Sequence, residues 1–256
     1  MHLVIGPGGM GFYAFLGSVA CIGLENIHEV SGASAGAILG LFICSGKTFE
    51  EIMEFSFGTD LKELATVNIM SLVTNFGLIS HSPIKKLFKS FFGDLKFKDL
   101  SKKLYVTSFC VNRSTTEYFS VDNYPDMSVI DAVCMSISVP FLFETTKYNT
   151  YTYIDGGIRE SLPVMAFMDK DPDSVLIIKK ECSAQHVPEI TTIKSFIHTL
   201  VNVVLDGVES IKTLSKEISI DTGDFNIFDF SMSHEDKMKL YTLGYQTTLS
   251  HLGSFK

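Results

Sequence analysis

The 256-residue sequence lacks the features of several protein classes, and each absence excludes one of them. It has no low-complexity or repeated segment, which argues against a solenoid or a disordered chain. Its longest apolar run, residues 35–44, is well short of the roughly 20 residues that span a bilayer. Residues 1–5 lead into a glycine cluster without a basic region or a cleavage site, so we expect no secretory signal peptide and no transmembrane segment.

Basic charge and paired cysteines are also scarce. The formal net charge of -8 argues against a nucleic-acid-binding face, which would be basic. Five cysteines, an odd number without a C-x-x-C pair, predict reduced thiols in the interior. No H-E-x-x-H or comparable cluster is present, so we expect no metal and no cofactor. Together these absences predict an intracellular protein that is soluble or peripherally associated with a membrane.

The pattern of strands and helices at the start of the chain indicates an α/β fold. Residues 2–5 read as a buried strand, a glycine turn follows, and residues 12–24 read as a helix with one apolar face. A second strand around Val30 and a helix over 35–45 complete a βαβα unit, which predicts a parallel sheet. At this length the chain fits one domain over residues 1–256.

The second strand ends in a candidate nucleophile. The pentapeptide at residues 32–36, Gly-Ala-Ser-Ala-Gly, fits G-x-S-x-G, in which a serine lies on a sharp turn between a strand and a helix. The following helix would direct free N–H groups and the positive end of its dipole at the Ser34 oxygen. Taken alone, the pentapeptide is explained equally well by close packing of small residues.

The glycine cluster at residues 6–11 has two readings, a phosphate site or a set of amides that bind an oxyanion. A dinucleotide fingerprint needs an acidic residue about 20 positions on, at a strand end. Here that position falls in the loop 25–29, so we expect no nucleotide. The G-K-T triplet at 46–48 also fails as a phosphate loop, because the upstream glycine would fall on Leu41. Thr48 and Glu51 instead predict a capping box.

Four ordered motifs over residues 3–164 give the sequence a family resemblance. They are the glycine loop, the serine turn, Ser138-Val139-Pro140-Phe141-Leu142-Phe143, and the segment that begins Ile154-Asp155-Gly156-Gly157. The sequence resembles the patatin-like phospholipases, a family of serine acyl hydrolases. That resemblance implies a three-layer α/β/α sandwich with a central mixed, mostly parallel sheet.

The glycine loop departs from the family pattern G-G-G-x-[KR]-G. In either possible register Pro7 replaces a glycine and the basic residue is missing. Proline has no N–H to donate. The resemblance then implies that the backbone N–H groups of Gly8, Gly9 and Met10 form the oxyanion hole, together with the N–H group of Ala35.

The resemblance also implies a catalytic dyad of Ser34 and Asp155, without a histidine between them. Asp155 would take the serine proton, Ser34 would attack an ester carbonyl, and water would hydrolyse the acyl-enzyme without calcium. A serine-acid-histidine triad stays open on chain order, because several histidines follow Asp155. Their settings in helices or polar loops favour structural or solvated roles. These histidines are His186, His198, His234 and His251.

The function implied is release of fatty acid from lipid esters, of phospholipase A type, on a phospholipid at a membrane surface. A neutral-lipid or small-ester hydrolase is an alternative with the same chemistry. A catalytically silent lipid-binding or storage relative is an alternative of another class, and the altered glycine loop makes it a serious one.

The remainder of the chain predicts supporting structure. Residues 50–82, rich in Phe, Leu and Met, should cover the mouth of the site, and a helix should begin at Ser82. The seven lysines of 85–103 favour a solvated amphipathic face over contact with an anionic membrane. Further strands are expected at 105–109, 118–121, 174–179 and 226–230, and further helices at 129–138, 193–216 and 233–252. Residues 190–256 should be structural, covering the sheet.

Overall fold

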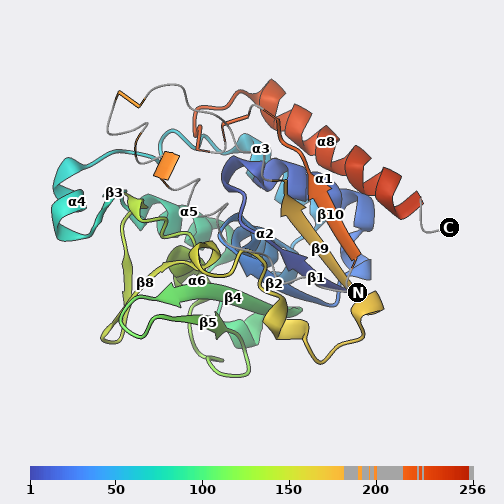
Figure 1. Ribbon diagram of the computed structural model, residues 1–256, viewed down its shortest axis with the longest axis horizontal. Coiled ribbons are helices and arrows are strands. Elements are labelled where there is room, and N and C mark those ends of the chain that lie inside the picture. The colour runs from blue at the N-terminus through green and yellow to red at the C-terminus, as the bar shows by residue number, and fades with distance from the viewer. Residues whose placement is uncertain are drawn as a thin grey trace.

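The computed structural model describes residues 1–181, 190–191, 196, 199–200, 216–223, 225–226 and 228–253. Their centre is an 8-stranded sheet in the order β10-β9-β1-β2-β4-β8-β7, with β5 also paired with β4 (Figure 1). Successive residues of β1 (His2–Ile5) point to opposite faces: Leu3 and Ile5 join the larger core, whereas Val4 joins a smaller one. Both faces of the sheet are therefore covered, which confirms the predicted layered α/β architecture.

The helices were mostly predicted correctly, and the short strands were mostly missed. The helices are α1 (Phe12–Ile22), α2 (Ala35–Cys44), α3 (Phe49–Gly58), α4 (Ile69–Thr74), α5 (Ser82–Phe92), α6 (Val129–Ser136) and α8 (His234–Gly253). The strands after β1 are β2 (Glu29–Ala33), β3 (Gly77–Ile79), β4 (Lys103–Cys110), β5 (Thr115–Phe119), β6 (Phe141–Phe143), β7 (Thr146–Tyr148), β8 (Tyr151–Asp155), β9 (Val175–Lys180) and β10 (Lys216–Ile220). No strand was predicted at β3, β6, β7, β8 or β10.

The chain direction of the strands next to β4 positions the candidate site. Strand β2 pairs in parallel with residues 103–107 of β4, and β8 pairs in antiparallel fashion with residues 108–110. Because β5 occupies the other edge of β4, β2 and β8 lie along the same edge and run toward each other. The two strands end opposite adjacent residues of β4: Ala33 pairs with Thr107 and Asp155 pairs with Ser108. Segments separated by more than a hundred residues thus meet at their carboxyl ends.

The last helix packs closely on the first. A Cβ atom on Gly17 of α1 would lie 1.9 Å from the Tyr241 carbonyl oxygen, and one on Gly244 of α8 would lie 1.8 Å from the Ala14 carbonyl oxygen. Two glycines therefore let the backbones of α1 and α8 touch, as Figure 1 shows for the two neighbouring helices. Helix α8 begins where the sequence predicts, and Ser233 caps it by accepting the Asp236 N–H at 3.1 Å.

The C-terminal part of the structure differs from two predictions. The strand expected at 226–230 is wrong, because the described residues there form turns stabilised by Asn226 and Asp229 side chains. Asn and Asp in short polar runs favour such local turns over a strand. The helix expected at 193–216 lies almost wholly outside the described residues, but its last residue, Lys216, begins β10 instead.

Most lysines of the basic stretch contact other groups of the protein itself. Lys85, Lys89, Lys98 and Lys103 pair with Asp131, Asp94, Asp126 and Asp122, respectively, and Lys102 donates to the carbonyl groups of Leu24 and Ile27. These contacts favour a role of the stretch within the protein over contact with an anionic membrane. Among the described residues, no helix has the length and apolarity needed to cross a bilayer.

Candidate active site

Ser34 occupies the sharp turn that the sequence predicts, between β2 and α2. Its backbone has φ 54° and ψ -121°, a conformation that is strained for a residue with a Cβ atom. The glycines on either side are required by sterics. A Cβ atom on Gly32 would lie 2.4 Å from the Gly36 carbonyl oxygen, and one on Gly36 would lie 2.2 Å from the Ile5 carbonyl oxygen. The turn therefore holds a serine in a strained conformation on a closely packed base.

Ser136, the last residue of α6, holds this turn from the side. The Ser34 N–H donates a hydrogen bond of 2.9 Å to the Ser136 hydroxyl oxygen, and both residues are buried. Sequence analysis missed Ser136, because nothing local marks a helical serine 102 positions away as a partner. Its only sequence signal is its place just before the segment 138–143.

Asp155 lies at the end of β8 and is fully buried. Its Oδ1 accepts the Gly157 N–H at 2.8 Å, and among the described residues Oδ2 accepts no hydrogen bond of ordinary geometry. Burial raises the pKa of the carboxyl group to about 7, and the Ser34 hydroxyl and the Gly157 N–H oppose this rise. The structure thus places the Ser34 hydroxyl close enough to the Asp155 carboxyl group to influence its pKa.

The two glycines after Asp155 let its turn fit between β4 and the glycine loop. A Cβ atom on Gly156 would lie 2.3 Å from the Thr107 carbonyl oxygen, and one on Gly157 would lie 2.8 Å from Pro7 Cγ. Pro7, which departs from the family pattern, therefore packs directly against the aspartate turn.

Within the described part of the chain, the glycine loop leaves backbone N–H groups free, and two of its residues line the pocket that contains Ser34. Gly9 has a φ of 51°, and residues Gly9–Gly11 form one turn of 3-10 helix, closed by a 2.8 Å bond from the Gly11 N–H to the Gly8 carbonyl oxygen. The N–H groups of Gly8, Gly9 and Met10 have no hydrogen-bond acceptor among the described residues. Of these three residues, Gly9 and Met10 line the same pocket as Ser34, and Gly8 does not.

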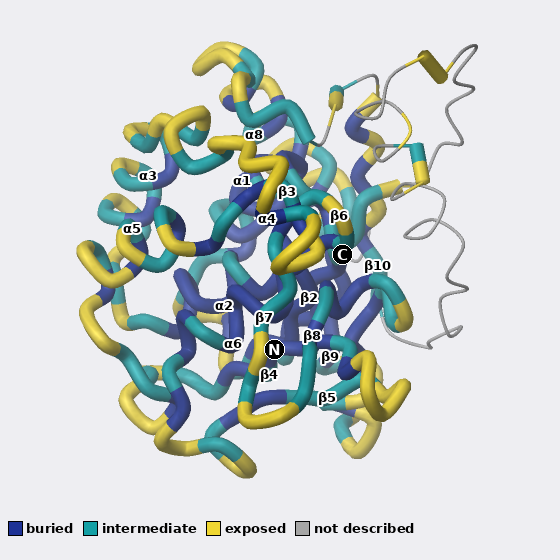
Figure 2. The backbone as a smooth tube through the Cα atoms, turned by 90° about the vertical axis from the view of Figure 1, so that its left-hand side faces the viewer, coloured by how far each residue is buried: buried dark blue, intermediate teal, exposed yellow. Residues whose placement is uncertain are grey.

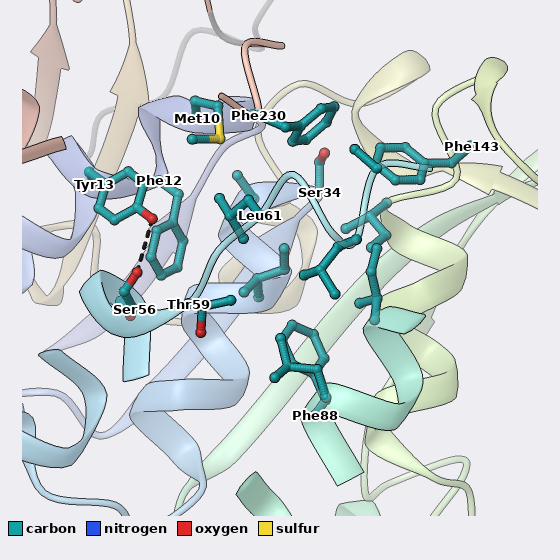
Figure 3. Close-up of a pocket in the computed structure, with 18 of the residues that line it drawn as sticks. Met10, Phe12, Tyr13, Ser34, Ser56, Thr59, Leu61, Phe88, Phe143 and Phe230 are labelled. Carbon is teal, nitrogen blue, oxygen red and sulfur yellow. Dashed lines mark hydrogen bonds between the residues drawn. The ribbon is translucent and has the colours of Figure 1, made fainter. Parts of the chain in front are cut away.

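This pocket opens to solvent. Its lining is mostly apolar, as the side chains in Figure 3 show. It encloses about 970 Å³ of empty space, including solvent at its mouth. None of its described lining residues is charged, and one of its few polar groups, the Tyr13 hydroxyl, is occupied by a 3.0 Å bond to the Ser56 carbonyl oxygen. Leu61, Leu64 and Ala65 line it, in line with the expectation that residues 50–82 cover the site.

The histidines that follow Asp155 were candidates for a triad. His186 and His198 lie outside the described residues. His234 begins α8, where its ring contacts Phe57 with a 5.4 Å separation of centroids, and His251 lies in the last turn of the same helix. Neither described histidine lines the pocket. Among the described residues, no group of three or more His, Cys, Asp or Glu side chains could hold a metal ion.

Comparison with known proteins assigns the family. The sequence model of the patatin-like phospholipase family matches residues 3–168, well over half of the chain. The chain belongs to the patatin-like phospholipase family. Its fold is similar to that of VipD from Legionella pneumophila (TM-score 0.70, 18% identity, 99% of this chain, 66% of that chain). It is also similar to the type III effector ExoU of Pseudomonas aeruginosa (TM-score 0.56, 19% identity, 99% of this chain, 52% of that chain).

Two viral proteins are similar in sequence to this family member. An uncharacterized protein of Acanthamoeba polyphaga mimivirus is 26% identical over 189 residues, which cover 68% of this chain and 63% of that protein. A probable lipid hydrolase of Invertebrate iridescent virus 6 is 27% identical over 179 residues, which cover 63% of this chain and 61% of that protein. The matches thus span less than two thirds of these relatives.

Proposed function

We propose that this chain is a serine acyl hydrolase that releases fatty acid from lipid esters, of phospholipase A type, with Ser34 as nucleophile and Asp155 as general base. The observation that carries the proposal is the meeting of the strained Ser34 turn and the buried Asp155 carboxyl group at the ends of β2 and β8. Family membership and the similarity to a probable lipid hydrolase support it.

The proposed reaction begins with transfer of the Ser34 hydroxyl proton to Asp155. The Ser34 oxygen forms a bond to the ester carbonyl carbon, and the carbonyl oxygen becomes an oxyanion. The N–H groups of Gly9 and Met10 stabilise this oxyanion, and the N–H groups of Gly8 and Ala35 adjoin them. The carbon–oxygen bond to the alcohol then breaks, and the proton on Asp155 passes to the leaving alcohol. Asp155 then deprotonates a water molecule, whose oxygen forms a bond to the acyl carbon. The bond from this carbon to the Ser34 oxygen breaks, the fatty acid leaves, and Asp155 returns the proton to Ser34.

A carboxyl group with a pKa near 7 can both take the proton from Ser34 and give it to the leaving alcohol at neutral pH. The uncharged, Phe-rich pocket beside Ser34 fits an acyl chain, which supports a lipid ester over a polar ester. The free amides of Gly9 and Met10 support retained catalysis despite Pro7, because they supply donors that proline cannot.

The test is fatty acid release from phosphatidylcholine liposomes in excess chelator. We expect release by the unmodified protein and a loss of about 10³-fold or more in Ser34→Ala and in Asp155→Ala. Ser90→Ala and Asp169→Ala change the same residue types at exposed positions and should leave the rate unchanged. Hydrolysis of small esters or neutral lipids alone would assign one of those substrates. No release, together with no Ser34 labelling by a serine-directed phosphonate, would identify a silent lipid-binding relative.

A further inference from the structure

A long uncharged segment begins beside the pocket and runs over the surface. Residues 64–84 contain no Asp, Glu, Lys or Arg. Five large apolar side chains in it are between 56% and 74% exposed: Val67, Ile69, Met70, Val73 and Phe76. Together with Phe141, which is 47% exposed, we call these residues the apolar rim. Exposed apolar side chains gathered in this way usually mark a binding surface.

Helix α4 in the rim exposes three of its four apolar side chains. Its polar Ser71 is buried, whereas Ile69, Met70 and Val73 face solvent. A helix selected only to cover a protein core would bury these apolar side chains and expose the serine. We therefore expect the outward apolar face of α4 to contact an apolar partner.

The rim is held in place by ordinary hydrogen bonds. The Asn68 side chain accepts the Met70 N–H at 3.0 Å and so caps α4. The Asn68 N–H donates to the Leu78 carbonyl oxygen at 2.7 Å, and the Thr145 N–H donates to the Asn75 carbonyl oxygen at 2.9 Å. These bonds fix α4 to the β3–β6 pair, so its apolar side chains are presented on a supported backbone.

The rim is continuous with the wall of the pocket. Leu64 and Ala65 line the pocket just before Val67, and Phe143 lines it two residues after Phe141. The parallel pairing of Gly77 with Phe141 joins the two segments. Figure 3 shows Leu61 and Phe143 on opposite sides of Ser34 at the pocket. Helix α4 lies at one end of the molecule's long axis in Figure 1, and its residues are mostly coloured as exposed in Figure 2.

We propose that the apolar rim inserts into the interfacial layer of a phospholipid membrane and guides an acyl chain toward Ser34. The proposal rests on the proposed function for the identity of the substrate. The rim carries no charge, so insertion depends on apolar burial and not on attraction to anionic lipid. Binding should therefore occur on zwitterionic phosphatidylcholine and persist at high salt.

The chain has no tryptophan, so one introduced tryptophan is a unique fluorescent probe. We would place it at the rim with Val73→Trp in a Ser34→Ala background, so that the vesicle lipid is not hydrolysed. Phosphatidylcholine vesicles should shift its emission to shorter wavelength, and brominated acyl chains should quench it. Met168→Trp in the same background is the matched control, because Met168 is 63% exposed outside the rim, and it should show neither effect.

Removal of apolar side chains tests whether the rim carries the binding. Ile69→Gln with Val73→Gln should weaken vesicle co-sedimentation about tenfold or more. Met168→Gln with Leu249→Gln removes the same number of exposed apolar side chains elsewhere and should leave binding unchanged. In the Ser34-containing protein, the rim variant should lose hydrolysis of vesicle lipid by a similar factor and keep hydrolysis of a soluble short-chain ester.

The results separate this proposal from the proposed function. Vesicle binding is measured in the Ser34→Ala background, so it does not depend on hydrolase activity. If the unmodified protein were inactive, the proposed function would be refuted, and the vesicle experiments would still test the rim proposal. The rim proposal is overturned if the Val73→Trp emission does not shift or shifts no more than the control. It is also overturned if Ile69→Gln with Val73→Gln abolishes self-association in sedimentation and leaves vesicle binding intact, which would make the rim a contact between copies.

Discussion

Ser34 and Asp155 lie at the ends of strands that meet head to head, yet the protein holds them by different means. Ser34 is held by sterics: the adjoining glycines leave no room for a Cβ atom, and the serine backbone is strained. Asp155 is held by burial, with one oxygen bonded to the Gly157 N–H and the carboxyl group within the influence of the Ser34 hydroxyl. The first arrangement makes the site sensitive to added volume, and the second makes it sensitive to charge and pH.

The largest expected effect is on the aspartate side. Because burial raises the folded-state pKa of Asp155 from 3.8 to about 7, its contribution to stability is fully present below pH 3.8 and is lost as pH rises through 7. Asp155→Asn should therefore be the more stable protein above pH 8, by up to about 4 kcal/mol, with no gain near pH 4. Its ester hydrolysis at pH 8 should fall about 10³-fold or more.

Urea unfolding between pH 4 and pH 9 measures this difference. Asp169→Asn changes an exposed carboxyl group and should show no comparable pH dependence. A stability difference between Asp155→Asn and the unmodified protein that stays constant with pH would contradict burial as the cause.

The next effect is steric and belongs to the serine side. Gly36→Ala should destabilise the protein by about 3 kcal/mol, because its methyl group would lie 2.2 Å from the carbonyl oxygen of Ile5 in β1. That cost exceeds the gain of about 1 kcal/mol in helix propensity. Gly58→Ala, whose Cβ atom meets nothing within 4 Å, is the control and should be neutral or stabilising in thermal unfolding. Equal effects for the two variants would refute the steric account.

Ser136→Ala should have an intermediate effect. It leaves the buried Ser34 N–H without its acceptor, which should cost about 2 kcal/mol of stability. Because the turn would be less well fixed, kcat should fall about tenfold while KM stays near its original value. Ser18→Ala also removes a buried hydroxyl, which bonds to the Ala14 and Gly244 carbonyl groups away from the pocket, and should lower stability without changing kcat. A loss of kcat in both variants would mean that Ser136 has no specific role.

The smallest effect concerns strain in the Ser34 backbone. Ser34→Gly should be about 1 kcal/mol more stable than Ser34→Ala, because glycine adopts a positive φ without steric cost. Ser90→Gly is the matched comparison in a normal helix, α5, and should be less stable than Ser90→Ala by a similar amount. The same sign at both positions, measured by thermal unfolding, would show that the Ser34 backbone is not strained.

The contrast between local and distant effects also explains what could be predicted from the sequence. The Ser34 turn and the capping box of Thr48 and Glu51 depend on neighbouring residues, so a short pattern specifies them. Asp155 was found only through resemblance, since its raised pKa comes from distant strands that bury it. Ser136 and β10 were missed for the same reason: their partners lie far away in the sequence. The outward face of α4 escaped notice because its apolar pattern resembles that of a buried helix.

The pH dependence of Ser34 labelling by a serine-directed phosphonate tests the central claim most directly. If Asp155 takes the proton of Ser34, the labelling rate should rise with pH and level off above an apparent pKa near 7, and Asp155→Asn should remove this rise and slow labelling. Label on another residue, or a Ser34 labelling rate that Asp155→Asn leaves unchanged across this pH range, would contradict the two-residue mechanism.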